Sequence, residues 1–428
     1  MPGADAAAPQ NTRFEDKSLL HLGLVIIFGI FATTLAQPQV LGKLPLQTIL
    51  NKELHVSATQ LSSFFFLCGL PWYFKPFAGI LTDAFPLFGT RRRHYLLIAT
   101  GLTVLSWIAL AFVPRTYNGL LLGCIVVNIF MVIMSTVVGA TLVEAGQRIG
   151  ATGRLSALRQ FVSSGCTLIN GPIAGALAAS GAFAITAGVN AAIAFTILPV
   201  AWFFLREKRV HTRDENVLRN ASQQLKVIFK SRNLWIGIGF IALYYFAPGF
   251  STPLYLRQSN ELKLSEQFIG NLGIYAGIAG LISAYLYSVL IKKLSIRTML
   301  YIGIGTGAVS TLAYLFYNGA TQAIIIEAQG AFFGTIAEVA LLDLAARSTP
   351  KGCEGLGYSL ILSVRNLALF GTDILGSKLK DMNFSFSSLV YMNAGTTVIV
   401  LFLIPILPAV LMRTKDSDPA PAPAEAAA

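Results

Sequence analysis

Residues Pro76–Arg93 read PFAGILTDAFPLFGTRRR and separate two long apolar runs of the chain. The stretch carries one acid, Asp83, passes through Pro86 and Gly89, and ends in three consecutive arginines. Glycine permits a tight turn of the backbone, and arginines favour the cytoplasmic side of a membrane. The stretch therefore predicts a short cytoplasmic turn between two membrane helices. Asp83 is placed there to bind a basic residue or a helix N-terminus.

The composition is that of a membrane protein. Hydrophobic residues make up 54% of the chain and charged residues 12%, with a mean hydropathy of +0.65. The net charge of +12 comes from basic residues in short loops, which favours solvated loops over nucleic-acid binding. The cysteines and histidines lack the spacing of disulfide frameworks or metal sites, and no phosphate-binding loop is present. We therefore expect no metal, no cofactor and no nucleic acid.

Apolar runs long enough to cross a bilayer recur along the chain and predict an all-α membrane protein. We expect about twelve transmembrane helices in two six-helix halves. Their centres lie near Gly29, Leu67, Val104, Met131, Cys166, Ile193, Leu243, Gly277, Gly307, Phe333, Leu367 and Thr397. The expected segments are a cytoplasmic N-terminal segment (1–17), an N-terminal bundle (18–205), a cytoplasmic linker (206–232), a C-terminal bundle (233–412) and a disordered tail (413–428).

The lysines and arginines predict the orientation. With both termini in the cytoplasm, 22 of the 32 fall in inner loops, 7 in outer loops, Lys43 among them, and 3 within spans. Cytoplasmic loops are enriched in these residues. We therefore expect a multi-pass protein of the plasma (inner) membrane with both termini inside.

The two halves carry related sequences. ATLVEAGQR (Ala140–Arg148) aligns with VALLDLAAR (Val339–Arg347), and SALRQFVSSG (Ser156–Gly165) aligns with LSVRNLALFG (Leu362–Gly371). The alignment superposes Glu144 on Asp343, Arg148 on Arg347, and Arg159 on Arg365. Two related halves are typical of transporters that rock one bundle against the other around a central site.

Several motifs resemble those of the folate–biopterin transporter family, a branch of the major facilitator superfamily. The similarity runs from about Leu19 to Leu411. Its marks are Lys75-Pro76 through Gly79, Asp83, Phe85-Pro86, Gly89 and Arg91–Arg93; Pro248 through Asn260-Glu261-Leu262 to Phe268; Leu344-Ala345-Ala346; and Pro350–Gly355 through Ser363 and Asn366. The family's fourth span is richer in acids, and Ser135 and Gly139 stand where aspartates would be expected.

The resemblance implies a major-facilitator fold and a secondary active transporter that works by alternating access. The implied substrate is a folate- or pteridine-like organic anion, moved together with protons by a monomer in the lipid bilayer. Two alternatives stay open: a transporter of a different organic anion or drug, and a membrane enzyme or receptor. An enzyme would need a nucleophile–base pair or a metal constellation, which the sequence does not offer, so we expect no catalytic site.

Charged residues inside spans are candidates for function, because burying a charge in a bilayer is costly. Arg365 lies near mid-span and is expected to bind an anionic group of the substrate, since guanidinium matches a carboxylate with two hydrogen bonds. The alternative is a structural ion pair with Asp373 or with an acid of the tenth span. Arg159, its counterpart, and Lys75 are further candidates for substrate binding.

Acidic residues are candidates for proton coupling and for gating. Glu327 and Glu338 are about three helical turns apart on the tenth span, and with Asp373 they are expected to carry protons. The expected gating residues are Asp83, Arg91, Arg92, Arg93, Glu144, Arg148, Asp343 and Arg347. Acid and base four residues apart attract one another on a helix, which favours a structural latch in both repeats.

Aromatic and amide side chains complete the expected binding site. Tyr244 and Tyr245 precede Pro248, which breaks the helical ladder and frees backbone groups that need partners. Their rings are expected to stack on a flat heterocycle, although aromatic residues also face lipid. Gln37 and Gln39 of the first span are expected to hydrogen-bond a heterocycle edge.

Overall fold

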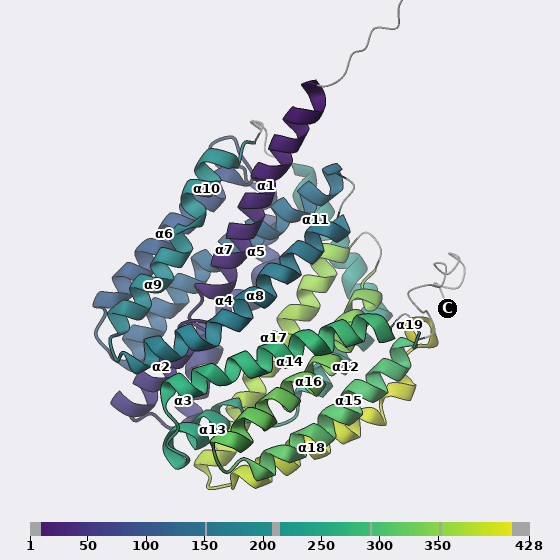
Figure 1. Cartoon of the computed structure of the whole chain (residues 1–428). Helices are drawn as coiled ribbons and strands as arrows, with labels where there is room; N and C mark the ends of the chain where they lie inside the picture. The colour runs from purple at the N-terminus through teal and green to yellow at the C-terminus, as the bar shows by residue number, and fades with distance from the viewer. Residues whose placement is uncertain (1–9, 150–151, 208–214, 292, 351–352, 413–428) are drawn as a thin grey trace, which may run out of the picture.

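The computed structural model describes residues 10–149, 152–207, 215–291, 293–350 and 353–412. Within them, nine helical spans are long and apolar enough to cross a membrane, and Leu20–Leu35 and Ala58–Cys68 are shorter apolar helices. Each of the twelve predicted span centres lies in a helix. The predicted fold class, an all-α membrane protein of two six-helix halves, is confirmed (Figure 1).

The N-terminal half contains the first six spans. Its elements are α1 (Gln10–Leu35), α2 (Lys43–Thr48), the π-helix η1 (Ile49–Glu53), α3 (Ala58–Cys68), α4 (Leu70–Tyr73), α5 (Lys75–Ala84), α6 (Arg93–Phe112), α7 (Tyr117–Ile149), α8 (Thr152–Ala179), α9 (Phe183–Phe195) and α10 (Ile197–Phe204). Its buried apolar side chains form one cluster within residues 25–205, joined by Tyr255 of the other half.

The C-terminal half follows a connecting helix, α11 (Glu215–Lys230). Its elements are α12 (Arg232–Tyr245), α13 (Ser251–Leu256), the π-helix η2 (Arg257–Glu261), α14 (Glu266–Leu290), α15 (Ile296–Leu312), the 3-10 turn η3 (Ala313–Phe316), α16 (Ala320–Ser348), α17 (Glu354–Asp381), α18 (Phe386–Leu401), the 3-10 turn η4 (Ile404–Ile406) and α19 (Ala409–Met412). Its main apolar cluster lies within residues 228–412.

Proline breaks the second span into three helices. Pro71 and Pro76 stand in the first turns of α4 and α5, where their missing N–H costs no hydrogen bond. Gly69 ends α3 and Phe74 ends α4. The break places Lys75 at the first position of α5.

The halves meet along two pairs of helices, α8 with α14 and α3 with α17. Figure 1 shows α8 and α14 side by side near the middle of the molecule. Glycines bring the two backbones together, because a Cβ at Gly171 would lie 2.3 Å from the Gly270 oxygen, and one at Gly175 would lie 3.0 Å from the Glu266 oxygen. Small residues at such crossings allow close packing of membrane helices.

The connecting helix α11 lies within the predicted linker and contacts both α5 and α17. We call the end of the molecule that carries α11 the linker end. The opposite end carries η1 and η2, and we call it the π-turn end.

Candidate functional site

A cavity of about 500 Å³ is lined by both halves of the molecule. The aromatic side chains in its wall are Phe65, Tyr244, Tyr245, Phe250, Tyr314 and Phe370. Its charged side chains are Lys43 and Asp373. Among the described lining residues, Gln39, Lys43 and Phe65 come from the N-terminal half and the others from the C-terminal half. A cavity of this size with mostly apolar walls and few polar groups is typical of small-molecule sites.

One wall of the cavity is built by the chain between α12 and α13. The Gly249 N–H donates to the Thr372 carbonyl at 2.9 Å, and a Cβ at Gly376 would lie 1.7 Å from the Gly249 oxygen. The Pro248 carbonyl accepts a hydrogen bond from Asn393 Nδ2 at 3.0 Å. Both backbone groups next to the break between α12 and α13 therefore have partners in the C-terminal half. The two glycines let α17 approach this loop closely enough to bring Asp373 to the cavity.

Asp373 is held by the first turn of α13. Its Oδ1 accepts from the Thr252 N–H at 3.0 Å, and its Oδ2 accepts from Thr252 Oγ1 at 2.6 Å. Lys43 of α2 lies in the same cavity wall, close enough to Asp373 for the charges to attract. Burial lowers the pKa of the Lys43 ammonium group, and Asp373 opposes that shift. The sequence placed Lys43 in an outer loop, whereas the structure makes it part of the cavity.

Arg365 of α17 is bound to three side chains. Its Nη2 forms an ion pair with Glu338 of α16, its Nε donates to the Tyr245 hydroxyl at 3.1 Å, and its Nη1 donates to Asn366 Oδ1 at 3.0 Å. The guanidinium also lies 5.2 Å from the centre of the Tyr245 ring. Of the two structural partners considered for Arg365, the acid of the tenth span is the one present. Because Tyr245 lines the cavity, this pair contacts the cavity wall.

Glu327 has a different environment from Glu338. Its Oε1 accepts from the Tyr317 hydroxyl at 3.3 Å and from Gln258 Nε2 at 3.4 Å. Among the residues that the structure describes, no lysine or arginine lies within ion-pair distance of it. The two acids predicted on one helix therefore have separate sets of partners.

The predicted polar residues of the first two spans have mixed outcomes. Gln39 lines the cavity, and its Oε1 accepts from Asn128 Nδ2 at 3.0 Å. Gln37 does not line the cavity, and it donates to the Thr33 carbonyl of α1, the helix that precedes it. Lys75 donates to Ser135 Oγ at 2.9 Å and lies 5.3 Å from the centre of the Trp72 ring.

A serine therefore partners Lys75 where the family pattern led us to expect an acid at that position. Arg159, an exposed side chain, lies close enough to Lys75 for the two positive charges to repel. Neither lines the cavity. The structure thus places Arg159 and Arg365 in separate surroundings, although the repeat superposes them.

The arginine turn at the linker end is fixed within its own half. The backbone N–H groups of Arg91, Arg92 and Arg93 donate to the Glu207 carboxylate at 2.9, 2.9 and 3.1 Å. A carboxylate at the start of α6 is favourable, because helix N-termini carry partial positive charge. No sequence motif singles out Glu207, which follows α10 in an otherwise basic stretch.

Asp343 and Arg347 form the predicted pair of acid and base on α16. Arg347 Nε donates to Asp343 Oδ1 at 2.9 Å, and Nη2 donates to Oδ2 at 3.3 Å. The side chains of Asp83, Glu144 and Arg148 lie outside the described part of the structure.

Contacts between the halves close the π-turn end. The Asp381 carboxylate of α17 accepts from the backbone N–H groups of Ala58 and Thr59 at 3.0 and 2.8 Å, so it caps α3 of the other half. An ion pair joins Lys52 to Glu266, and Asn51 Nδ2 donates to Asn260 Oδ1 at 2.8 Å. We call these three contacts the outer lock.

The outer lock was not predicted from the sequence, although a repeat marks its location. KLPLQTILNKELHVS (residues 43–57) aligns with STPLYLRQSNELKLS (residues 251–265) without a gap. Both segments form a short helix, a π-helix and a Ser N-cap, and both place a residue at positive φ, His55 at 48° and Lys263 at 50°. The repeat is short and polar, so a search for apolar runs passes over it.

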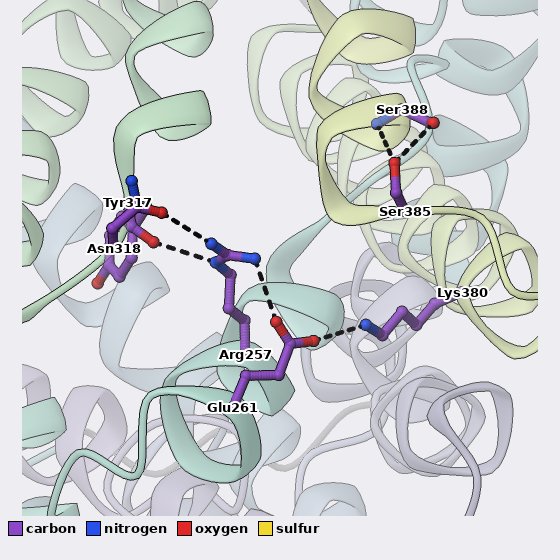
Figure 2. Close-up of polar contacts among 7 residues, drawn as sticks. All are labelled: Arg257, Glu261, Tyr317, Asn318, Lys380, Ser385 and Ser388. Carbon is purple, nitrogen blue, oxygen red and sulfur yellow. Dashed lines mark hydrogen bonds and ion pairs between the residues drawn. The ribbon is translucent and has the colours of Figure 1, made fainter.

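The C-terminal member of this repeat is braced by further polar contacts (Figure 2). Glu261 lies between Arg257, at 3.1 Å, and Lys380, at 2.7 Å. Arg257 also donates to the Tyr317 carbonyl and to Asn318 Oδ1, each at 3.1 Å. These bonds tie η2 to α17 and to the chain that leads into α16.

Two six-helix halves around a shared cavity are the major-facilitator fold, and solved structures share it. A mutant of the peptide transporter POT in complex with sulfate has a TM-score of 0.71 at 12% identity, covering 93% of this chain and 96% of that one. A D-xylose-proton symporter has a TM-score of 0.65 at 16% identity, covering 92% and 97%. Among the described residues, no group of three His, Cys, Asp or Glu side chains could hold a metal ion.

The chain belongs to the BT1 family, whose model matches residues 38–419. It is 26% identical over 349 residues to the folate-biopterin transporter of Synechocystis sp., covering 77% of this chain and 69% of that protein. It is 26% identical over 400 residues to folate transporter 1 of Plasmodium falciparum, covering 86% and 77%. The resemblance to folate–biopterin transporters is confirmed, and the chain is an integral membrane transporter, not an enzyme.

Proposed function

We propose that this chain is a secondary active transporter of folate- or pteridine-like organic anions, coupled to protons and working by alternating access. The observation that carries the proposal is the cavity between the halves. It combines six aromatic rings with one carboxylate and one ammonium group. Flat rings favour a flat heterocycle, and the names of the relatives support the same substrate class.

The orientation follows from the loop charges. We place the linker end and both termini in the cytoplasm of the plasma (inner) membrane, so the outer lock faces outside. In that orientation the structure is closed to the outside, and transport requires the outer lock to break. We propose that the monomer is the transporting unit.

Coupling is assigned to the acids on α16. In this proposal the anionic group of the substrate replaces Glu338 on Arg365, and the released Glu338 serves as a proton carrier. Glu327, with phenol and amide partners, is a second carrier. Arg159, Lys75 and Gln37 were predicted to bind substrate, and they do not line the cavity. In this proposal they contact substrate in another conformation of the transport cycle.

Uptake by proteoliposomes tests the proposal. Labelled folate and labelled biopterin are offered with and without an inward-directed proton gradient. We expect accumulation with the gradient and only equilibration without it. Equal uptake in both conditions would remove proton coupling, whereas uptake of neither compound would favour the alternative of a different organic anion or drug.

A further inference from the structure

The two charged side chains of the cavity, Asp373 and Lys43, do not form an ion pair with each other. Asp373 and Lys43 come from opposite halves and line the same cavity. Among the described residues, no acid lies within 4.0 Å of the Lys43 ammonium group, and the group makes no hydrogen bond. The ammonium group is therefore available to a ligand inside the cavity.

Asp373 also keeps unused capacity for hydrogen bonds. An ionised carboxylate offers about four lone-pair sites. Thr252 occupies one on each oxygen and fixes the plane of the carboxylate. One acceptor site on each oxygen stays free, and the two sites point in different directions, so Asp373 can accept one N–H bond from a ligand.

We propose that Asp373 and Lys43 together recognise the 2-amino-4-oxopyrimidine edge of a pteridine. That edge presents two neighbouring N–H donors, the 2-amino group and N3–H, followed by the O4 acceptor. Asp373 accepts from the 2-amino group, and Lys43 donates to O4. The inference rests on the proposed function, and it assigns the substrate's ring, rather than its anionic tail, to this part of the cavity.

The surrounding rings fit this assignment. Phe250 and Tyr314 lie in the same cavity wall with ring centres 5.1 Å apart and planes tilted by 66°. Phe65 and Phe370 line the cavity as well. Aromatic faces exclude water from the ring of a bound ligand, and a charged hydrogen bond gains strength where water is excluded.

Two pteridines of nearly equal size separate this proposal from a structural role. Pterin carries the 2-amino group, whereas lumazine (2,4-dioxopteridine) carries a carbonyl oxygen there. Asp373 would repel that oxygen. In Asp373→Asn, the amide nitrogen can donate to the lumazine oxygen. The preference for pterin over lumazine should therefore reverse in Asp373→Asn, which loss of a purely structural bond would not produce.

The experiment measures binding of pterin and lumazine to the purified full-length protein in detergent. We expect the wild type to prefer pterin by about tenfold or more, the size of one charged hydrogen bond. We expect Asp373→Asn to prefer lumazine, and Lys43→Met to weaken both ligands about tenfold with their ratio kept, since both carry O4. Glu53→Gln and Lys378→Met, which lie outside the cavity, serve as matched controls.

The binding results distinguish failure of this assignment from failure of the proposed function. An unchanged pterin-to-lumazine ratio in Asp373→Asn, or unchanged binding in Lys43→Met, would overturn the assignment while leaving the proposed function intact. A wild type that binds neither pteridine would overturn the proposed function and this assignment together. If Asp373→Asn fails to fold, the Lys43→Met arm decides, because Lys43 bonds no other described side chain.

Discussion

Arg365 was predicted to bind the substrate anion, and the structure shows it bound to side chains of the protein itself. Its guanidinium is bound by Glu338, Tyr245 and Asn366, so the charge is not left alone in the membrane. A substrate anion must compete with Glu338 for the same fork. The arginine can therefore bind substrate only by exchanging one carboxylate for another.

Replacing Arg365 tests that exchange. Arg365→Lys keeps the charge but loses the two-pronged geometry, so folate binding should weaken by about 1.5–3 kcal/mol. Binding of biopterin, which lacks a carboxylate, should change less. Arg115→Lys, at an exposed ion pair with Glu53, is the control and should change neither. Equal losses for both ligands in Arg365→Lys would assign this residue to structure.

Glu327 and Glu338 are the proposed proton carriers on α16, and replacing each with Gln tests that role. Gln in place of the true proton carrier cannot load a proton, so gradient-driven accumulation should vanish. Exchange of labelled for unlabelled substrate should persist, because exchange moves no net proton. Proteoliposome assays of Glu327→Gln and Glu338→Gln check this. Normal accumulation by both variants would leave proton coupling without a carrier on α16.

At the scale of helices, the α8–α14 crossing depends on glycine. A Cβ at Gly171 would lie 2.3 Å from the backbone oxygen of Gly270, which a side-chain rotation cannot relieve. Gly171→Ala should destabilise the protein by about 1–3 kcal/mol, the usual cost of overpacking. Gly165→Ala on the same helix has no atom within 4 Å of the added methyl and is the control. Thermal unfolding in detergent measures both, and equal midpoints would contradict the account.

The outer lock depends on a helix cap between the halves, because the Asp381 carboxylate caps α3 of the opposite half. Asp381→Ala removes both hydrogen bonds to the start of α3, so the π-turn end should open more often. A cysteine introduced at cavity residue Ser251, in a background lacking the native cysteines, should then react several-fold faster with a membrane-impermeant thiol reagent. The same rate as in the parent would show that Asp381 does not hold the lock.

For the whole molecule, apolar runs and loop charges were enough to predict the helices, because bilayer thickness sets span length. The break at Pro248 was also predictable, because proline interrupts the hydrogen bonds of a helix wherever it occurs. Partners distant in sequence were not predictable. The sequence near Arg365 does not indicate that Glu338, rather than Asp373, is its partner. Lys43 was predicted to be a loop residue, because the sequence does not show that α2 packs against the cavity. The repeat at residues 43–57 and 251–265 was readable, but it is polar and lies outside the spans.

In the proposed mechanism, the halves must separate at the outer lock for substrate to pass. Asn51 and Asn260 donate to each other across the halves, at 2.8 and 3.2 Å, so cysteines at both positions can be joined by a short cleavable cross-linker. A cross-link between Glu53→Cys and Arg115→Cys, within one half, is the matched control.

Folate uptake by proteoliposomes carrying Asn51→Cys and Asn260→Cys is the most direct measurement. We expect uptake to stop when the halves are cross-linked, to return when the linker is cleaved, and to continue throughout in the control. Undiminished uptake by fully cross-linked protein would contradict alternating access through this lock.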